Sequence, residues 1–248
     1  MITPKVTGAI ITALIIILGV ALLFPALKID TKFGSNTDTL THSVLLTFNI
    51  INSSNMPSWC YDLSSFLKNN NIHSTVFMTG IIADAYPDCV SRFSTDTDIG
   101  SMSYSQNSIT SIPTYPAQLS TIKDGKRSVD LHGELNSTLF RAPFGQVDEN
   151  IYSLLTRSHI LADFSYIDHY NVYTDGLSGK TFYRFPLALL DKFSASKSSV
   201  ADPKIPMMIT FDNHDSLIEV KKFINASSDF SHNFVSASEL TNMDLTIR

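Results

Sequence analysis

The sequence predicts an α/β domain built on a parallel sheet, with one apolar segment before it. Short β-rich runs alternate with helical patterns of about ten residues, which is typical of β–α–β units in parallel sheets. The 248 residues and the 44% hydrophobic content are enough for one large domain with a sizeable core. This alternation does not distinguish an open sheet from a closed barrel.

The first elements are indicated by their hydrophobic periods. A β-rich run predicts a strand at 43–48, and an amphipathic pattern predicts a helix over Ser58–Lys68 that Ser58 can cap. The apolar residues expected on one face of that helix are Trp59, Leu63, Phe66 and Leu67. A second strand is expected at 74–78, followed by a short helix that ends near Ala85 because Pro87 interrupts it.

The later elements follow the same alternation. The remaining strands are expected at 98–103, 138–144, 160–166, 206–211 and 234–236. The remaining helices are expected at 115–131, 148–158 and 216–224. In the first of these helices Leu119 and Ile122 share one side, although Gly125 lowers the helix propensity. Asp148 is a favourable residue for capping the next helix, and we make no prediction for 176–203.

The first segment of the chain differs sharply from the rest. Gly8 to Leu27 is an apolar stretch that is long enough to span a membrane, since about 20 helical residues cross roughly 30 Å. A cleaved signal peptide is the alternative, but no convincing cleavage site follows the stretch. We therefore expect four parts: a short tail (1–6), a transmembrane signal anchor (7–27), a tether (28–42) and a C-terminal domain (43–248).

Two features favour a C-terminal domain outside the cell, on a protein that crosses the cell membrane once. Asn52, Asn136 and Asn225 each begin a triplet that fits the glycosylation acceptor pattern. Cys60 and Cys89, the only cysteines, are expected to form a disulfide if the domain is exported, and two buried free thiols are the alternative. The lysines on either side of the apolar stretch do not fix its orientation.

Three motifs accompany the predicted strands. They are Thr47-Phe48-Asn49-Ile50, Ile99-Gly100-Ser101-Met102-Ser103-Tyr104-Ser105-Gln106 and Leu139-Phe140-Arg141-Ala142-Pro143-Phe144-Gly145. In order and spacing they resemble the signatures of the polysaccharide deacetylase (NodB-homology) family, over about 43–240. The resemblance implies an irregular (β/α) barrel whose site lies at the C-terminal ends of the strands. Within the family, the chain resembles degenerate, membrane-anchored members of an archaeal kind.

The resemblance also implies a chemistry, for which this chain has unsuitable residues. Members of the family remove acetyl groups from N-acetylated sugars with a divalent metal, held by one aspartate and two histidines, and with a second aspartate as base. The base position matches Asn49, whose amide does not accept a proton at useful pH. The metal positions match Ile50, Met102 and Gln106, and none of these is a good zinc ligand. We therefore expect neither a metal cofactor nor deacetylation at this site.

Other family positions predict a binding surface. Arg141 matches the residue that orients the base, and beside Asn49 we expect it to bond backbone carbonyls or another acid. Ile209-Thr210-Phe211 matches a Leu-x-His signature, with Phe211 at the position of the histidine beside the substrate. The residues expected at a groove that stacks on sugar faces are Tyr104, Arg141, Phe144, Tyr166 and Tyr170.

A second group of side chains offers metal donors. Asp212, His214 and Asp215 follow one predicted strand, and Asp163, Asp168 and His169 follow another. Carboxylates and imidazoles at strand ends predict, as one alternative, a relocated site for a divalent metal such as zinc. The other interpretation is that 212–215 is a turn that caps the following helix.

These observations predict a membrane-anchored, non-catalytic domain that binds glycan or acts as a scaffold or accessory subunit. The alternative is an active hydrolase of amide bonds that uses the relocated metal site. The expected partners are the lipid bilayer and either a cell-surface glycan or a membrane or envelope assembly. The net charge of −5, without a basic cluster in the sequence, argues against nucleic acid.

Overall fold

The computed structural model describes residues 43–51, 55–165, 171–174, 181–184, 188–189, 207–228 and 233–242. The predicted membrane helix and tether, and the side chains of Asn52, Tyr166 and Tyr170, lie outside these residues. Within the described ranges no helix has both the length and the apolar character that a membrane span requires.

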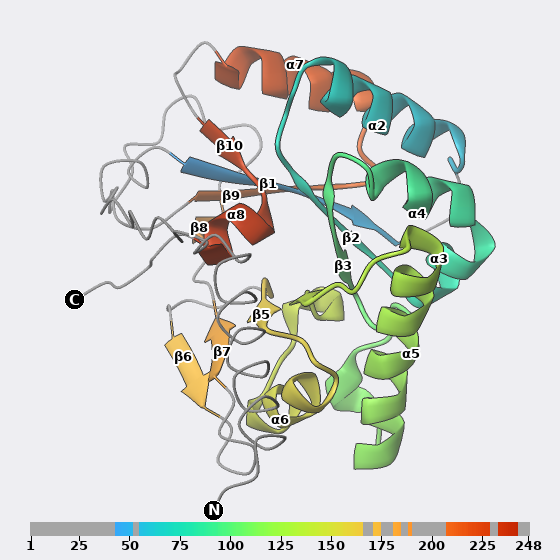
Figure 1. The fold of residues 1–248 in the computed structure, drawn as a ribbon, viewed down its shortest axis with the longest axis vertical. Coiled ribbons are helices and arrows are strands. Elements are labelled where there is room, and N and C mark those ends of the chain that lie inside the picture. Colours follow the sequence, from blue (N-terminus) through green and yellow to red (C-terminus); the bar gives the residue numbers. More distant parts are fainter. Residues whose placement is uncertain are drawn as a thin grey trace, which may run out of the picture. The chain divides into compact units, whose positions relative to one another are not determined.

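One mixed sheet, shown in Figure 1, organises the described part of the chain. Its strands are β1 (Ser43–Ile50), β2 (Thr75–Met78), β3 (Asp98–Ser101), β4 (Leu139–Phe140), β5 (Ala162–Asp163), β6 (Asn171–Thr174), β7 (Thr181–Arg184), β8 (Ala188–Leu189), β9 (Met207–Asp212) and β10 (Asn233–Val235). Their order is β6-β7-β5-β4-β3-β2-β1-β9-β8, and β10 pairs with the first residues of β1. Apart from the antiparallel pair β6–β7, the described pairings are parallel. This parallel α/β half-barrel confirms the predicted class.

Helices follow most of the strands, as predicted. They are α2 (Ser58–Asn69), α3 (Gly80–Ala85), α4 (Pro87–Phe93), α5 (Tyr115–Gly133), α6 (Glu149–Arg157), α7 (Leu217–Ser228) and α8 (Ala237–Asn242). The carboxylate of Asp148 caps α6 by accepting the amide hydrogen of Ile151 (2.9 Å). One prediction was wrong, because Ser58 does not cap α2. The short helix α3 ends at Ala85 as predicted, and Pro87 begins α4, since proline fits the first turn of a helix.

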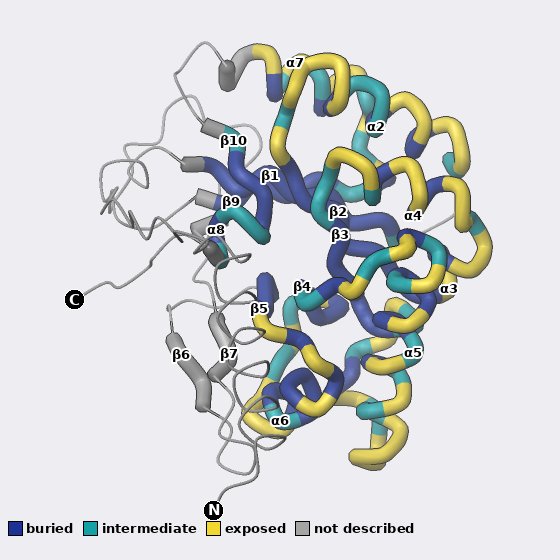
Figure 2. The backbone as a smooth tube through the Cα atoms, in the orientation of Figure 1, coloured by how far each residue is buried: buried dark blue, intermediate teal, exposed yellow. Residues whose placement is uncertain are grey.

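The two faces of the sheet bury different side chains. Along β1, Leu46, Phe48 and Ile50 pack with residues of α2, α3, α4 and α7 in one apolar core. Leu45 lies on the other face, which we call the inner face, with apolar residues that include Phe77 and Met208. Figure 2 shows β2 buried along its length, together with β1 from Val44 onward and β3 from Ile99 onward, whereas each covering helix keeps an exposed side. Alternation therefore directs Thr47 and Asn49 to the inner face as well.

Two predicted strands are much shorter than expected. The strand predicted at 138–144 contains only β4, because the chain turns after Phe140 into a 3₁₀ turn, η3 (Pro143–Gly145), with Phe144 in a left-handed conformation (φ 58°). Of the strand predicted at 160–166, the described part, 160–165, contains only β5. The chain therefore leaves the sheet directly after Phe140, and Arg141, the next residue, reaches Asn49 on β1.

The predicted disulfide is present. Cys60 on α2 and Cys89 on α4 are bonded, with their Cα atoms 5.7 Å apart and a sequence separation of 29. Both residues are buried beside the helix-facing side of the sheet. The bond joins two helices that follow different strands. It therefore limits the conformations of the unfolded chain and lowers its entropy.

We expect the double change Cys60→Ser and Cys89→Ser to lower the free energy of unfolding of the full-length protein by roughly 3–4 kcal/mol, the chain-entropy value for a loop of this length. Urea unfolding with and without reductant measures this loss. The wild type should lose stability in reductant, whereas the double variant should not respond. Alkylation of both thiols in wild-type protein prepared without reductant would contradict the bond.

Gly125 lets α5 approach the loop that follows β3. A Cβ atom at this position would lie 2.2 Å from the carbonyl carbon of Ser103 and 2.3 Å from its oxygen. The same loop is held by the amide of Tyr104, which donates to the carbonyl of Thr121 on α5 (2.8 Å). A glycine that looked unfavourable for the helix is thus required by its packing.

We expect Gly125→Ala to destabilise the protein by about 1–3 kcal/mol through overpacking, despite the gain of about 1 kcal/mol in helix propensity. The control is Lys123→Ala, an exposed change on the same helix, which should alter the free energy of unfolding by less than about 0.5 kcal/mol. Urea titration compares the two. Equal stability of Gly125→Ala and wild type would show that the loop moves aside at no cost.

Candidate functional site

The candidate site lies on the inner face at the C-terminal ends of the strands. β1 contributes Thr47 and Asn49, and β9 contributes Thr210 and Asp212, which are their direct partners in the parallel register. Arg141, in the turn after β4, reaches across to the same place. All but Asp212, which is partly exposed, are buried, so their polar atoms depend on one another for hydrogen bonds.

Arg141 is the centre of this network and is 0% exposed. Its Nη1 donates to the side-chain oxygens of Asn49 (2.9 Å) and Thr47 (3.1 Å), and its Nε donates to the carbonyl of Phe164 (3.0 Å). Its Nη2 contacts the sulfur of Met208 (2.8 Å), and the guanidinium lies 4.3 Å from the ring centroid of Phe77. The prediction that Arg141 bonds a backbone carbonyl is confirmed. Its place in a glycan-contacting groove is wrong, because no ligand reaches a buried guanidinium.

The turn that carries Arg141 is itself fixed from β5. One carboxylate oxygen of Asp163 accepts both the amide (3.0 Å) and the hydroxyl (2.5 Å) of Ser165. The Ser165 oxygen in turn accepts the amide hydrogen of Ala142 (2.8 Å). Asp163 is therefore a positioning residue for the Arg141 turn, whereas the sequence had suggested it as a metal donor.

The amide of Asn49 has a defined orientation. Its Oδ1 accepts from Arg141, and its Nδ2 donates to Oδ1 of Asp212 (2.9 Å). A guanidinium only donates and a carboxylate only accepts, so the two partners fix which amide atom faces which side. The side chain therefore bridges a cation and an anion, and its nitrogen presents a hydrogen where a general base would need a lone pair.

The predicted metal positions do not converge on one point. Ile50 is fully buried on the helix-facing side of β1, opposite to Asn49, whereas Met102 is buried in the inner-face core. Ile50 pairs with Met78, and the amide of Met102 donates to the carbonyl of Met78 on the far side of β2. The two backbones are thus two strand spacings apart, roughly 10 Å. Gln106 is exposed on the following loop.

Phe211 does not occupy the position expected beside a substrate. Its ring stacks on Phe48 at 6.0 Å and meets Phe223 of α7 edge-on at 5.5 Å, in the helix-facing core. The inner-face residue at the end of β9 is Asp212. The alternation of polar residues in Thr47-x-Asn49 and Thr210-x-Asp212 was the signal that could have identified this pair, since residues two apart share a strand face.

The relocated metal site is not formed by the described residues, which contain no group of three His, Cys, Asp or Glu side chains able to hold an ion. Asp215 folds back so that its carboxylate accepts the amide hydrogen of Asp212 (2.7 Å), and the amide of Asp215 donates to the carbonyl of Asp212 (2.9 Å). His214 is exposed. Residues 212–215 therefore form the turn of the second interpretation, and Asp168 and His169 lie outside the described residues.

Two of the predicted groove residues are accessible. Phe144 is 64% exposed on η3, and Tyr104 is half-buried after β3, with its ring against Gly80. Both follow strands that end at the site, so their rings lie on the same end of the sheet as Asn49. They provide aromatic surface, a suitable platform for the apolar face of a sugar ring.

The fold and the order of its motifs define the class of protein. The sequence model described as polysaccharide deacetylase matches residues 36–160, half of the chain, and the protein therefore belongs to this family. No curated protein matches the sequence.

Solved structures show the same fold. Wild-type BA3943 from Bacillus anthracis, a CE4 family pseudoenzyme, has a TM-score of 0.59 at 10% identity, over 82% of this chain and 66% of that chain. A BA3943 mutant with restored enzymatic activity has a TM-score of 0.60 at 10% identity, over 82% and 68%. Peptidoglycan deacetylase PdaC from Bacillus subtilis has 0.59 at 17%, over 82% and 91%. The match spans about two thirds of the BA3943 chains.

The contact between Asn49 and Asp212 generates a direct test. We expect Asn49→Asp to lower the free energy of unfolding by about 1–3 kcal/mol, because a second carboxylate would face Asp212 and the donated hydrogen bond would be lost. The swap Asn49→Asp with Asp212→Asn should recover most of the loss, since the new carboxylate still accepts from Arg141 and the new amide donates to it. A double-mutant cycle from urea titrations measures this coupling. Strictly additive single effects would show that the pair is not coupled.

Proposed function

We propose that this protein is a degenerate, membrane-anchored member of the polysaccharide deacetylase family that binds glycan at the cell surface without deacetylating it. The observation that carries the proposal is the Asn49 amide, held between Arg141 and Asp212 with its nitrogen as a donor. A deacetylase needs a group here that takes a proton from the attacking water. An amide in this position orients its neighbours but does not remove that proton.

The metal that the family uses also does not fit the residues present. Ile50 offers no donor atom, Met102 offers a soft thioether from within an apolar core, and Gln106 offers a neutral amide oxygen. Zinc prefers imidazole, thiolate and carboxylate ligands in a tetrahedral set. We therefore assign no metal-dependent step to this site.

Glycan binding is supported by the exposed aromatic side chains at the same end of the sheet. Phe144 is held outward by its left-handed turn, and Tyr104 is anchored through its backbone to α5 and α3. Rigid aromatic surface near a fixed polar network suits a sugar, whose rings have apolar faces and polar edges. A scaffolding or accessory role in an envelope assembly would use the same surface.

The surface location is supported by the disulfide, because such bonds persist mainly in oxidising compartments. The apolar segment Gly8–Leu27 would provide the bilayer anchor, and the archaeal source stays a prediction. Asn225 is exposed, as glycosylation would require, whereas the side-chain oxygen of Asn136, which is also exposed, accepts from Lys126 in the wall of a cavity. The alternative, a hydrolase with a relocated metal site, has less support, because Asp215 is engaged in a turn with Asp212.

The catalytic half of the proposal is tested on the full-length protein in detergent. We expect no bound zinc by elemental analysis and no acetate released from a tetramer of N-acetylglucosamine. The change Asn49→Asp, Ile50→Asp, Met102→His and Gln106→His is the smallest that restores the family residues. We expect it to lose several kcal/mol of stability, because Ile50→Asp puts a carboxylate into the helix-facing core. Stoichiometric zinc with acetate release by the wild type would refute the proposal.

The binding half is tested by calorimetric titration with the same tetramer. We expect Phe144→Ala to weaken binding roughly fivefold, on the scale of about 1 kcal/mol for one aromatic contact. The matched control is Tyr61→Ala, because Tyr61 is an aromatic residue that is 53% exposed but lies on α2, which covers the helix-facing side of the sheet. Equal affinity of the Phe144→Ala variant and the wild type would remove this surface from the proposal.

A further inference from the structure

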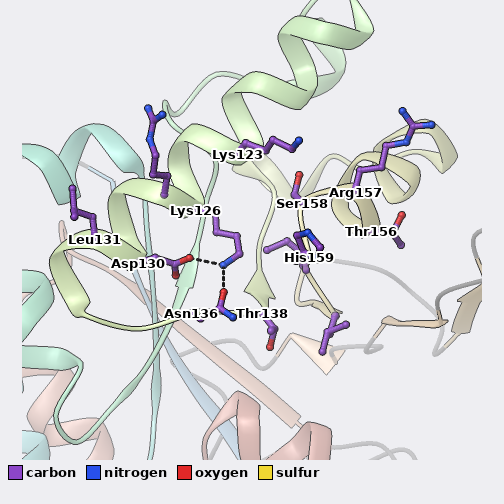
Figure 3. A pocket seen from close by; sticks show the side chains of 13 residues that line it. Lys123, Lys126, Asp130, Leu131, Asn136, Thr138, Thr156, Arg157, Ser158 and His159 are labelled. Carbon is purple, nitrogen blue, oxygen red and sulfur yellow. Dashed lines mark hydrogen bonds and ion pairs between the residues drawn. The ribbon is translucent and has the colours of Figure 1, made fainter. Parts of the chain in front are cut away.

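A cavity of about 1140 Å³ lies at the opposite ends of the strands, between α5 and the end of α6 (Figure 3). Its wall includes Thr138, which precedes β4, and Ile160 and Leu161, which precede β5. We call it the basic cavity, after the charged and titratable side chains that line it: Lys123, Lys126, Arg127, Asp130, Arg157 and His159.

The charge of the basic cavity is opposite to that of the whole protein. Among the described residues, four Lys and Arg side chains and one carboxylate line it, whereas the chain has a net charge of −5. Asp124 offsets part of this charge by pairing with Arg127 (3.0 Å), and Arg157 lies over the ring of Tyr115 (5.5 Å). A concave surface of one sign concentrates the field and attracts counter-ions of the opposite sign.

Two lysines differ in a way that is typical of a prepared anion site. Lys126 is only 8% exposed, and its ammonium is fixed by Asp130 and by the side-chain oxygen of Asn136 (2.8 Å). Lys123 is exposed and has no ion pair or hydrogen bond among the described residues, and Figure 3 shows it extending from α5 toward Ser158. Lys126 therefore holds the wall in place, and Lys123 keeps its charge available for a ligand.

The other groups in the basic cavity fit a sugar chain. Because Asn136 uses its oxygen for Lys126, its amide nitrogen remains a donor, and Thr138 adds a hydroxyl. Leu131 and Leu161, which are 69% and 47% exposed, flank these polar groups. Among the described residues, no Phe, Tyr or Trp side chain lines the cavity to provide a stacking platform for nucleobases. The volume also exceeds the needs of a single inorganic anion, since it matches the largest ordinary ligand pockets.

We propose that the basic cavity binds an anionic oligosaccharide, with an oxyanion of the sugar on Lys123 and hydroxyl groups on Asn136 and Thr138. The oxyanion is the carboxylate of a uronic acid or the phosphate of a sugar phosphate. This site lies at the other end of the sheet from Phe144 and is independent of the glycan surface proposed there. The protein thus has a second, charge-selective carbohydrate site.

The test is calorimetric titration of the full-length protein in detergent, made in a host without N-glycosylation so that Asn136 is unmodified. The probes are a tetramer of galacturonic acid, mannose 6-phosphate, the neutral tetramer of N-acetylglucosamine and inorganic phosphate. We expect the acidic tetramer or the sugar phosphate to bind, with an affinity that falls as salt rises. Lys123→Glu should weaken that binding by about tenfold or more, since a charge-assisted contact becomes repulsive.

The matched control is Lys222→Glu, an exposed lysine on α7 with the same change in net charge and no place in the cavity. It should bind as the wild type does, and so should Phe144→Ala, which separates this site from the aromatic surface. The proposal is overturned if neither anionic sugar binds up to about 1 mM, or if Lys123→Glu and Lys222→Glu lose affinity equally. Inorganic phosphate that competes as tightly as the sugars would also overturn the assignment to a carbohydrate.

Discussion

The burial of one guanidinium determines how the site end of this domain is built. Taking Arg141 out of water costs several kcal/mol unless its donors are satisfied. Oxygen atoms of β1 and of the segment after β5 accept hydrogen bonds from the guanidinium. The sulfur of Met208 and the ring of Phe77 complete its surroundings. The residue therefore ties together segments that are far apart in sequence, and the early end of β4 is the backbone consequence of delivering it.

This constraint gives Asn49 a specific chemical task. A buried cation on one side and a carboxylate on the other require a group that accepts toward the first and donates toward the second. An amide does both, whereas a carboxylate would satisfy Arg141 and repel Asp212. Asparagine at this position is thus matched to two neighbours. Its amide is hydrogen-bonded to both Arg141 and Asp212, so a change at Asp212 alters the hydrogen bonding of Asn49 as well.

Local patterns in the sequence were enough for much of the fold but not for the direction of the critical side chains. The amphipathic period located α2, and the capping carboxylate located α6. Asn49-Ile50 was interpreted as an adjacent pair that serves one site, although neighbours in a strand point to opposite faces and Ile50 is in the helix-facing core. Phe211 was misplaced for the same reason. The contacts of Arg141 with β1 and β9 cross 67 to 94 residues of sequence, which a local period cannot reveal.

Local sequence patterns also did not reveal how charged side chains gather in space, and this differs between the two ends of the domain. The sequence has no basic cluster. Spacings of three and four residues nevertheless place Lys123, Lys126 and Arg127 along one side of α5. Arg157 and His159, at the end of α6 and directly after it, line the same cavity. At the site end, the cation is enclosed and is coupled through an amide to an anion, so its field is neutralised locally. In the basic cavity, Lys123 has no such partner among the described residues. The end of the sheet with the basic cavity, opposite to the family site, is therefore the one where we expect the stronger electrostatic attraction of a ligand.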